Sequence, residues 1–171
     1  PDYAFQYCGS LADVPLPSSL VSIGVSAFRE CDGLSAVVMP NTVTTLNKNA
    51  YESCNTLTTV TLSSGLQAIP DNAFRDCGSL VDVPLPPSLV SIGTGAFEQC
   101  RSLTSVNMPN TVTTLNNSAY YVCTNLKEVK LSENLKNIGD ASFCECGNLI
   151  SIDIPASVST INSHAFRSCV K

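Results

Sequence analysis

The residues best able to do chemistry in this chain are its cysteines. The 171 residues include nine of them and a single histidine. Cys144 and Cys146 form a C-x-C pair, a spacing that can ligate a metal or exchange thiols. His164 would be the obvious further ligand or catalytic base for such a pair. Whether the pair forms a site depends on where the other cysteines fall.

Eight of the nine cysteines recur at every twenty-third position: Cys8, Cys31, Cys54, Cys77, Cys100, Cys123, Cys146 and Cys169. If each step is one structural repeat, these side chains form a straight column. A column supplies one ligand per repeat and parallel Cβ directions, which suit neither a tetrahedral metal site nor a disulfide. We therefore expect a ladder of reduced, buried thiols, with no metal and no cofactor.

Cys144 falls outside this ladder, in a column of mostly charged or polar residues: Gln6, Arg29, Glu52, Arg75, Glu98, Tyr121 and Arg167. We expect Cys144 to be the one exposed thiol and Cys146 to face the interior. Two alternatives stay open for Cys144. It could join Cys146 and His164 around a metal, or it could form an intermolecular disulfide.

The sequence also lacks the residues of an enzyme active site. His164 belongs to a column of turn residues, and no G-x-S-x-G motif accompanies it. Asp13 and Asp82 share a column but lie three repeats apart, roughly 14 Å, which is too far for an acid–base pair. We predict that the protein is not an enzyme.

The same period extends to the apolar residues. The unit reads C-x-x-L-x-x-V-x-L-P-x-x-L-x-x-I-x-x-x-A-F-x-x, and units start at residues 8, 31, 54, 77, 100, 123 and 146. A longer period overlies it, because residues 8–76 resemble residues 77–145. Columns of Leu, Val and Ile at this spacing predict coils stacked around one continuous core.

This pattern resembles the BspA-like, or Treponema-type, leucine-rich repeat family. The resemblance covers essentially the whole chain, through the L-x-x-V-x-L-P, L-x-x-I and A-F-x-x-C motifs. It implies an α/β repeat solenoid, a right-handed superhelix with a parallel β-sheet on one face. Short extended segments and helical or 3₁₀ turns are expected on the other face. Residues 1–171 form one array of about seven repeats.

Local patterns place the elements within each coil. V-x-L alternates with period two and predicts a short strand, which the following Pro ends. L-x-x-I predicts a second extended segment, and A-F-x-x-C a single helical or 3₁₀ turn. We expect a left-handed turn at a column of Gly and Asn and a different local turn at Pro70, which interrupts it. The column is Gly24, Asn47, Gly93, Asn116, Gly139 and Asn162.

The side chains that point outward from the V-x-L strands are the candidate binding face. They are small and mixed in character: Asp13, Pro15, Ala36, Val38, Thr59, Thr61, Asp82, Pro84, Ser105, Asn107, Glu128, Lys130, Ser151 and Asp153. No aromatic or Arg anchor is among them. The face is either a solvated spacer or a weak, multivalent contact surface.

The composition and net charge limit the classes of binding partner. A net charge of −5 and a pI near 4.6 argue against nucleic acid, and no apolar run is long enough to insert into a membrane. A second hydroxyl-rich column could match a glycan or ice lattice: Ser22, Thr45, Ser91, Thr114 and Thr160. Asn116 opens an N-x-S sequon and is a possible N-glycosylation site.

The start and end of the sequence fall inside repeat units, and neither looks like a polar cap, so we expect a piece of a longer array. The family resemblance implies a surface or secreted protein that adheres to host matrix or cell-surface proteins. The alternative is a structural spacer or building block that packs on copies of itself. Both hypotheses place the protein outside the cell or on its surface.

Overall fold

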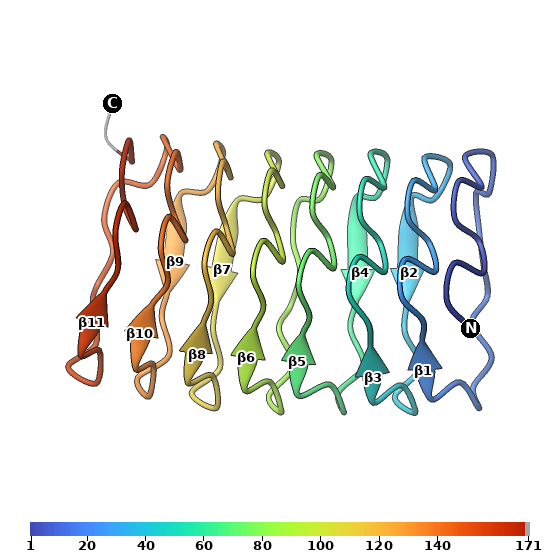
Figure 1. Cartoon of the computed structure of the whole chain (residues 1–171), viewed down its shortest axis with the longest axis horizontal. Helices are drawn as coiled ribbons and strands as arrows, with labels where there is room; N and C mark the ends of the chain where they lie inside the picture. Colours follow the sequence, from blue (N-terminus) through green and yellow to red (C-terminus); the bar gives the residue numbers. More distant parts are fainter. Residues whose placement is uncertain (170–171) are drawn as a thin grey trace.

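The protein, analysed as a computed structural model describing residues 1–169, is a row of parallel coils, with one coil to each sequence repeat (Figure 1). The described range contains no helix, and therefore none able to cross a membrane. Its strands are β1 (Ser22–Ile23), β2 (Ala36–Val38), β3 (Thr45–Leu46), β4 (Thr59–Thr61), β5 (Ala68–Ile69), β6 (Ser91–Ile92), β7 (Ser105–Asn107), β8 (Thr114–Leu115), β9 (Glu128–Lys130), β10 (Asn137–Ile138) and β11 (Thr160–Ile161).

The longest sheet is built from the L-x-x-I segments. It is parallel and five-stranded, in the order β11-β10-β8-β6-β5, and β1 and β3 form a separate pair along the same row. Each residue pairs with its equivalent one repeat away, as Ser91 does with Thr114. One buried aliphatic per strand, such as Ile92 or Leu115, points into the core, except in β11, where Ile161 is exposed. The repeat period is therefore also the register of the sheet.

Pro70 explains the gap between β3 and β5. At the equivalent positions the backbone N–H of Asn47 donates to the Ile23 carbonyl at 3.1 Å, and that of Gly93 donates to Ile69 at 2.8 Å. Proline has no N–H, so Leu46 receives no such bond. The turn after Pro70 has the same residues at positive φ as its neighbours, Asn72 (54°) and Asp76 (58°), so the prediction of a different local turn was wrong. What changes at Pro70 is the sheet, whose ladder is interrupted.

The V-x-L face is less continuous than the predicted sheet. Only β2–β4 and β7–β9 form ladders there within the described residues, and a single bridge links Thr59 to Asp82. Pro15 and Pro84 occupy the position of Val38 and Thr61 in the neighbouring coils, and proline removes the donor that a ladder needs. The ladder also ends after β9, where the equivalent residue is Asp153, so proline explains only part of the interruption. The prediction of one continuous parallel sheet on this face was wrong.

The A-F-x-x-C segments are tight turns, so the prediction of helical or 3₁₀ turns was also wrong. Cys31 N–H bonds to the Phe28 carbonyl three residues back, but residues at positive φ, such as Ser26 (50°) and Glu30 (58°), stop the turn from continuing as a helix. The left-handed residues thus lie two and six positions after the Gly/Asn column, so the prediction of a left-handed turn at that column was wrong. At Gly139 glycine is needed for space, since a Cβ there would come within 2.4 Å of the preceding coil.

The core consists of continuous side-chain columns. One aromatic per coil stacks on the next, with ring centroids 5.0–5.6 Å apart and interplanar angles of 10° or less. Leucines, valines and isoleucines fill the rest of each coil. Because every layer repeats the same contacts, the core fixes the height and rotation of each coil relative to its neighbours.

Candidate functional site

The predicted binding face is on the surface. Of its fourteen side chains, Ser105 is half-buried and the others are exposed. The strands position them by alternation, since Val37, Val60 and Val106 point inward between outward-facing neighbours. The predicted orientation of the strands is therefore confirmed, and a binding role for this face stays a prediction.

The chemistry of the face changes along the array. It is neutral in the second and third coils, where Val38, 69% exposed, lies beside Thr61 on the paired strand β4. Towards the C-terminal coils it carries both signs of charge, at Glu128, Lys130 and Asp153. Among the described residues no ion pair involves these side chains, which leaves them available to a partner.

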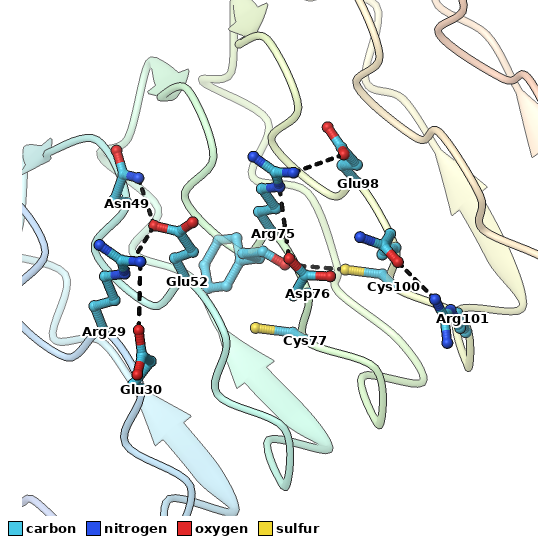
Figure 2. A network of polar contacts seen from close by, with 12 residues as sticks. Arg29, Glu30, Asn49, Glu52, Arg75, Asp76, Cys77, Glu98, Cys100 and Arg101 are labelled. Atoms are coloured by element: carbon cyan, nitrogen blue, oxygen red, sulfur yellow. Dashed lines mark hydrogen bonds and ion pairs between the residues drawn. The ribbon is translucent and has the colours of Figure 1, made fainter. Parts of the chain in front are cut away.

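A separate row of charges lies on the turns and is paired within the molecule (Figure 2). Arg29 lies 3.2 Å from Glu52, and Arg75 lies 3.1 Å from Glu98 in the following coil. Asn49 donates a further hydrogen bond to Glu52 at 2.5 Å. Burial raises the pKa of Glu98, and the Arg75 guanidinium opposes that shift. These charges link adjacent coils and leave little free charge for a ligand.

Cys144 belongs to the same column, and the prediction that it is the exposed thiol was wrong. Its side chain is only 5% exposed, and burial raises the pKa of its thiol. The equivalent residues on either side are Tyr121 and Arg167, whose side chains extend well beyond a cysteine sulfur. A short side chain between two long ones is covered by them. Cys8, in the ladder column, is exposed instead.

The other ladder thiols are buried, as predicted, and make a contact that sequence reasoning missed. Each sulfur from Cys31 to Cys169 donates to the carbonyl of the aromatic residue in the preceding coil, at 2.9–3.2 Å. Burial raises the pKa of Cys31 to about 11 and that of Cys146 to about 12. The thiols stay protonated at neutral pH and are poor nucleophiles.

The remaining candidate residues do not gather into a site. His164 is exposed, and its Nδ1 lies 3.6 Å from Asp140. Within residues 1–169 no three His, Cys, Asp or Glu side chains are placed to hold a metal ion. Asn116 is half-buried and donates its amide hydrogen to the Ile92 carbonyl at 3.0 Å. Glycosylation at Asn116 stays a prediction; the modified Nδ2 would keep one hydrogen.

Solved structures with the same fold come from bacteria. The chain superimposes on a leucine-rich repeat protein of Bacteroides ovatus with a TM-score of 0.84 and 30% identity, over 88% of this chain and 39% of that one. It matches the leucine-rich repeat protein of T. pallidum with a TM-score of 0.80 and 33% identity, over 88% of this chain and 70% of that one. The chain thus spans well under half of the Bacteroides protein.

A third neighbour is a leucine-rich cell surface protein of Faecalibacterium prausnitzii, with a TM-score of 0.51 and 25% identity over 98% of this chain and 60% of that one. A search of curated proteins found no match. The model of the BspA type leucine rich repeat region matches residues 1–123 and 44–171, which together span the whole sequence. The chain belongs to the BspA-type leucine-rich repeat family.

Proposed function

We propose that this array is a non-catalytic interaction module, which attaches a surface or secreted protein to protein partners outside the cell. The observation that carries the proposal is the exposed outward face of the V-x-L segments, to which every coil contributes equivalent side chains. Host matrix proteins, cell-surface proteins and glycans are the partners it would meet there. The Faecalibacterium neighbour, itself a cell surface protein, supports this location.

The physical basis of the proposal is repetition. A weak contact made by one coil is repeated along the array, so that several contacts formed together give an avidity far above the affinity of one. The core holds the spacing between these contacts constant, which avoids the entropy cost of ordering a flexible surface. Such a surface needs no aromatic hot spot to bind a repetitive partner.

The test is a panel of immobilised matrix proteins and glycans, with binding followed by biolayer interferometry. Replacing Val38 and Thr61 together by Glu should weaken binding at least about tenfold, because two charges would then lie on the neutral part of the face. The matched control replaces Val21 and Thr44 by Glu. These exposed residues precede β1 and β3, and the control should leave binding unchanged.

Light scattering would distinguish the proposed module from the alternative of a spacer or building block. A module of the proposed kind stays a monomer over a range of concentrations and binds members of the panel. Growth of oligomers with concentration, together with no binding to any of them, would overturn the proposal in favour of self-assembly.

A further inference from the structure

A small hollow lies between the V-x-L segments of two neighbouring coils, which start at residues 77 and 100, and the aromatic column of the core. Val83, Leu85 and Ser105 line it from the V-x-L segments, and Phe97 and Tyr120 line it from the aromatic column. Its volume is about 10 Å³. A cavity needs about 10–15 Å³ to hold a water molecule. The hollow therefore has room for one water and for no larger ligand.

The hydroxyl of Tyr120 is an unpaired polar group at this place. Tyr120 is 1% exposed, and its hydroxyl has no hydrogen-bond partner among the described residues. Burial of a hydroxyl without a partner is unfavourable, and folded proteins give nearly all such groups a protein or water partner. Phenylalanine fills the aromatic column at every other position except Tyr51. Packing of the ring alone therefore does not explain the tyrosine.

Backbone groups beside the hollow are unpaired as well. Between β4 and β7 lies one coil that has no strand on this face (Figure 1). Its residues 82–84 form no ladder with residues 105–107 in the described range, although residues 105–107 pair with 128–130 on their other side. In a continuous ladder the N–H of Val83 would donate to the carbonyl of Ser105. Neither group has a backbone partner there.

The break in the ladder is local. Before it, Thr104 N–H donates to the Val81 carbonyl at 3.2 Å, and after it, the Thr111 hydroxyl donates to the Pro87 carbonyl at 2.9 Å. On the opposite side of the same two coils, β6 pairs with β8. These bonds hold the coils at the spacing of one repeat. The opening between them can therefore take a single water but not a further strand.

The same combination occurs 69 residues earlier. Tyr51 is fully buried, and its hydroxyl also lacks a partner in the described residues. Its coil contains β2, which pairs with β4 but with no strand of the preceding coil. Coils that are linked to the preceding coil on this face carry phenylalanine instead, at Phe74, Phe97 and Phe143. The last coil has neither a ladder nor a tyrosine, but hollows of about 630 Å³ and 450 Å³ admit solvent there directly.

We infer that the hollow is a binding site for one internal water molecule, held by the Tyr120 hydroxyl and by the unpaired backbone groups of Val83 and Ser105. The water accepts a hydrogen bond from the Val83 N–H, donates one to the Ser105 carbonyl and bonds to the Tyr120 hydroxyl. Three such bonds are typical of a buried water. The water replaces the missing ladder bond between the coils. The site lies inside the array, so the inference does not depend on the proposed function.

A crystal structure of the whole chain at atomic resolution tests the site directly. It should show a water in the hollow, within about 2.7–3.2 Å of Tyr120 Oη and of the Val83 nitrogen. A dry hollow would overturn the inference. So would a direct hydrogen bond from the Tyr120 hydroxyl to a protein group.

Oxygen-17 relaxation dispersion of the solvent tests the site in solution, because its amplitude counts water molecules with long residence times in the protein. Tyr120→Phe should lower the amplitude by the contribution of one water. The matched control is Tyr121→Phe, which removes a surface hydroxyl that lies 3.4 Å from the Glu145 carboxylate and should leave the amplitude unchanged. Equal amplitudes for Tyr120→Phe and the parent would overturn the inference.

The sign of the change in stability distinguishes a hydrated hydroxyl from a dry one. Tyr120→Phe should lower the urea concentration at the midpoint of unfolding, because a hydrogen-bonded hydroxyl is lost. In a dry hollow the same substitution would remove an unpaired buried group and raise the midpoint. A raised midpoint would therefore overturn the inference.

Discussion

Thiol accessibility is decided by the neighbouring coils and not by the residue before or after a cysteine. Cys8 is exposed, whereas Cys144 and the seven later ladder members are buried. A polar thiol reagent should therefore label Cys8 within minutes and the others only after unfolding, as read by mass spectrometry of tryptic peptides. Rapid labelling of Cys144 in the folded protein would restore the prediction that its column is fully exposed.

The buried thiols also predict how stability depends on pH. Unfolded thiols lose their protons near pH 9.0, whereas burial holds the pKa of Cys31 at about 11 and that of Cys146 at about 12. The folded state therefore keeps protons that the unfolded state loses. Stability is complete below pH 9 and falls above it, by roughly 1.4 kcal/mol per pH unit for each such thiol.

Urea unfolding at pH 8 and at pH 10.5 measures this effect. The control is the double variant Cys31→Ser and Cys146→Ser, whose hydroxyls do not titrate in this range, so its stability should fall less between the two conditions. If the variant and the parent lose the same free energy of unfolding between pH 8 and pH 10.5, the two thiols do not cause the pH dependence of stability.

Much of the candidate face could be predicted from single residues, and the exceptions have physical causes. The V-x-L alternation placed the outward side chains correctly because a strand has only two faces. The cover of Cys144 comes from Tyr121 and Arg167, which lie one repeat away on either side. The S–H bond to a carbonyl of the preceding coil depends on the three-dimensional offset between coils, which a column of identical residues does not reveal.

At the scale of elements, Pro70 controls whether the main sheet is continuous. Pro70→Asn should join β3 to β5, because it restores an N–H for the Leu46 carbonyl and an amide like that of Asn47. Two added hydrogen bonds are worth about 1 kcal/mol each. Loss of the proline constraint on the unfolded chain costs about 0.4–1 kcal/mol. The net expectation is a gain of about 1 kcal/mol in the free energy of unfolding.

Hydrogen exchange and urea unfolding check this prediction together. The new amide at position 70 should exchange slowly with solvent hydrogen. The urea concentration at the midpoint of unfolding should rise. Pro86→Ser is a matched control, since serine already occupies that column at Ser63 and Ser132 and no ladder bond is restored. A new amide that exchanges as fast as an exposed one would show that the sheet stays interrupted.

The order of segments within a coil was predictable because apolar columns recur at fixed positions. The conformation of the corners was not. Residues at positive φ include Ser26, Asn49, Ala141 and His164, which share no residue type that would mark them in a sequence. Their conformation is imposed by the turn, whereas Gly139 is required because the backbone of the preceding coil comes close.

At the scale of the molecule, the aromatic column should carry much of the cohesion between coils. Phe97 is 1% exposed and stacks between Phe74 at 5.5 Å and Tyr120 at 5.2 Å. Phe97→Ala should lower the free energy of unfolding by about 3–5 kcal/mol, through lost burial and a cavity. A loss near zero in urea unfolding would contradict the packing of this column.

The position of an aromatic ring along the array should set how much stability is lost when that ring is removed. Phe166 is half-buried and stacks on Phe143 alone in the described range. Phe166→Ala should therefore cost roughly half as much as Phe97→Ala, because less apolar area leaves the core. Equal losses would show that the array unfolds without regard to the position of the ring.

The ladder of S–H bonds has a consequence for biogenesis. All nine cysteines are free thiols, and seven of them hold successive coils together through hydrogen bonds. Such a fold needs no oxidant to form and loses nothing to a reductant. Its stability should therefore be the same under reducing and mildly oxidising conditions, so that folding would not depend on the redox state of the compartment.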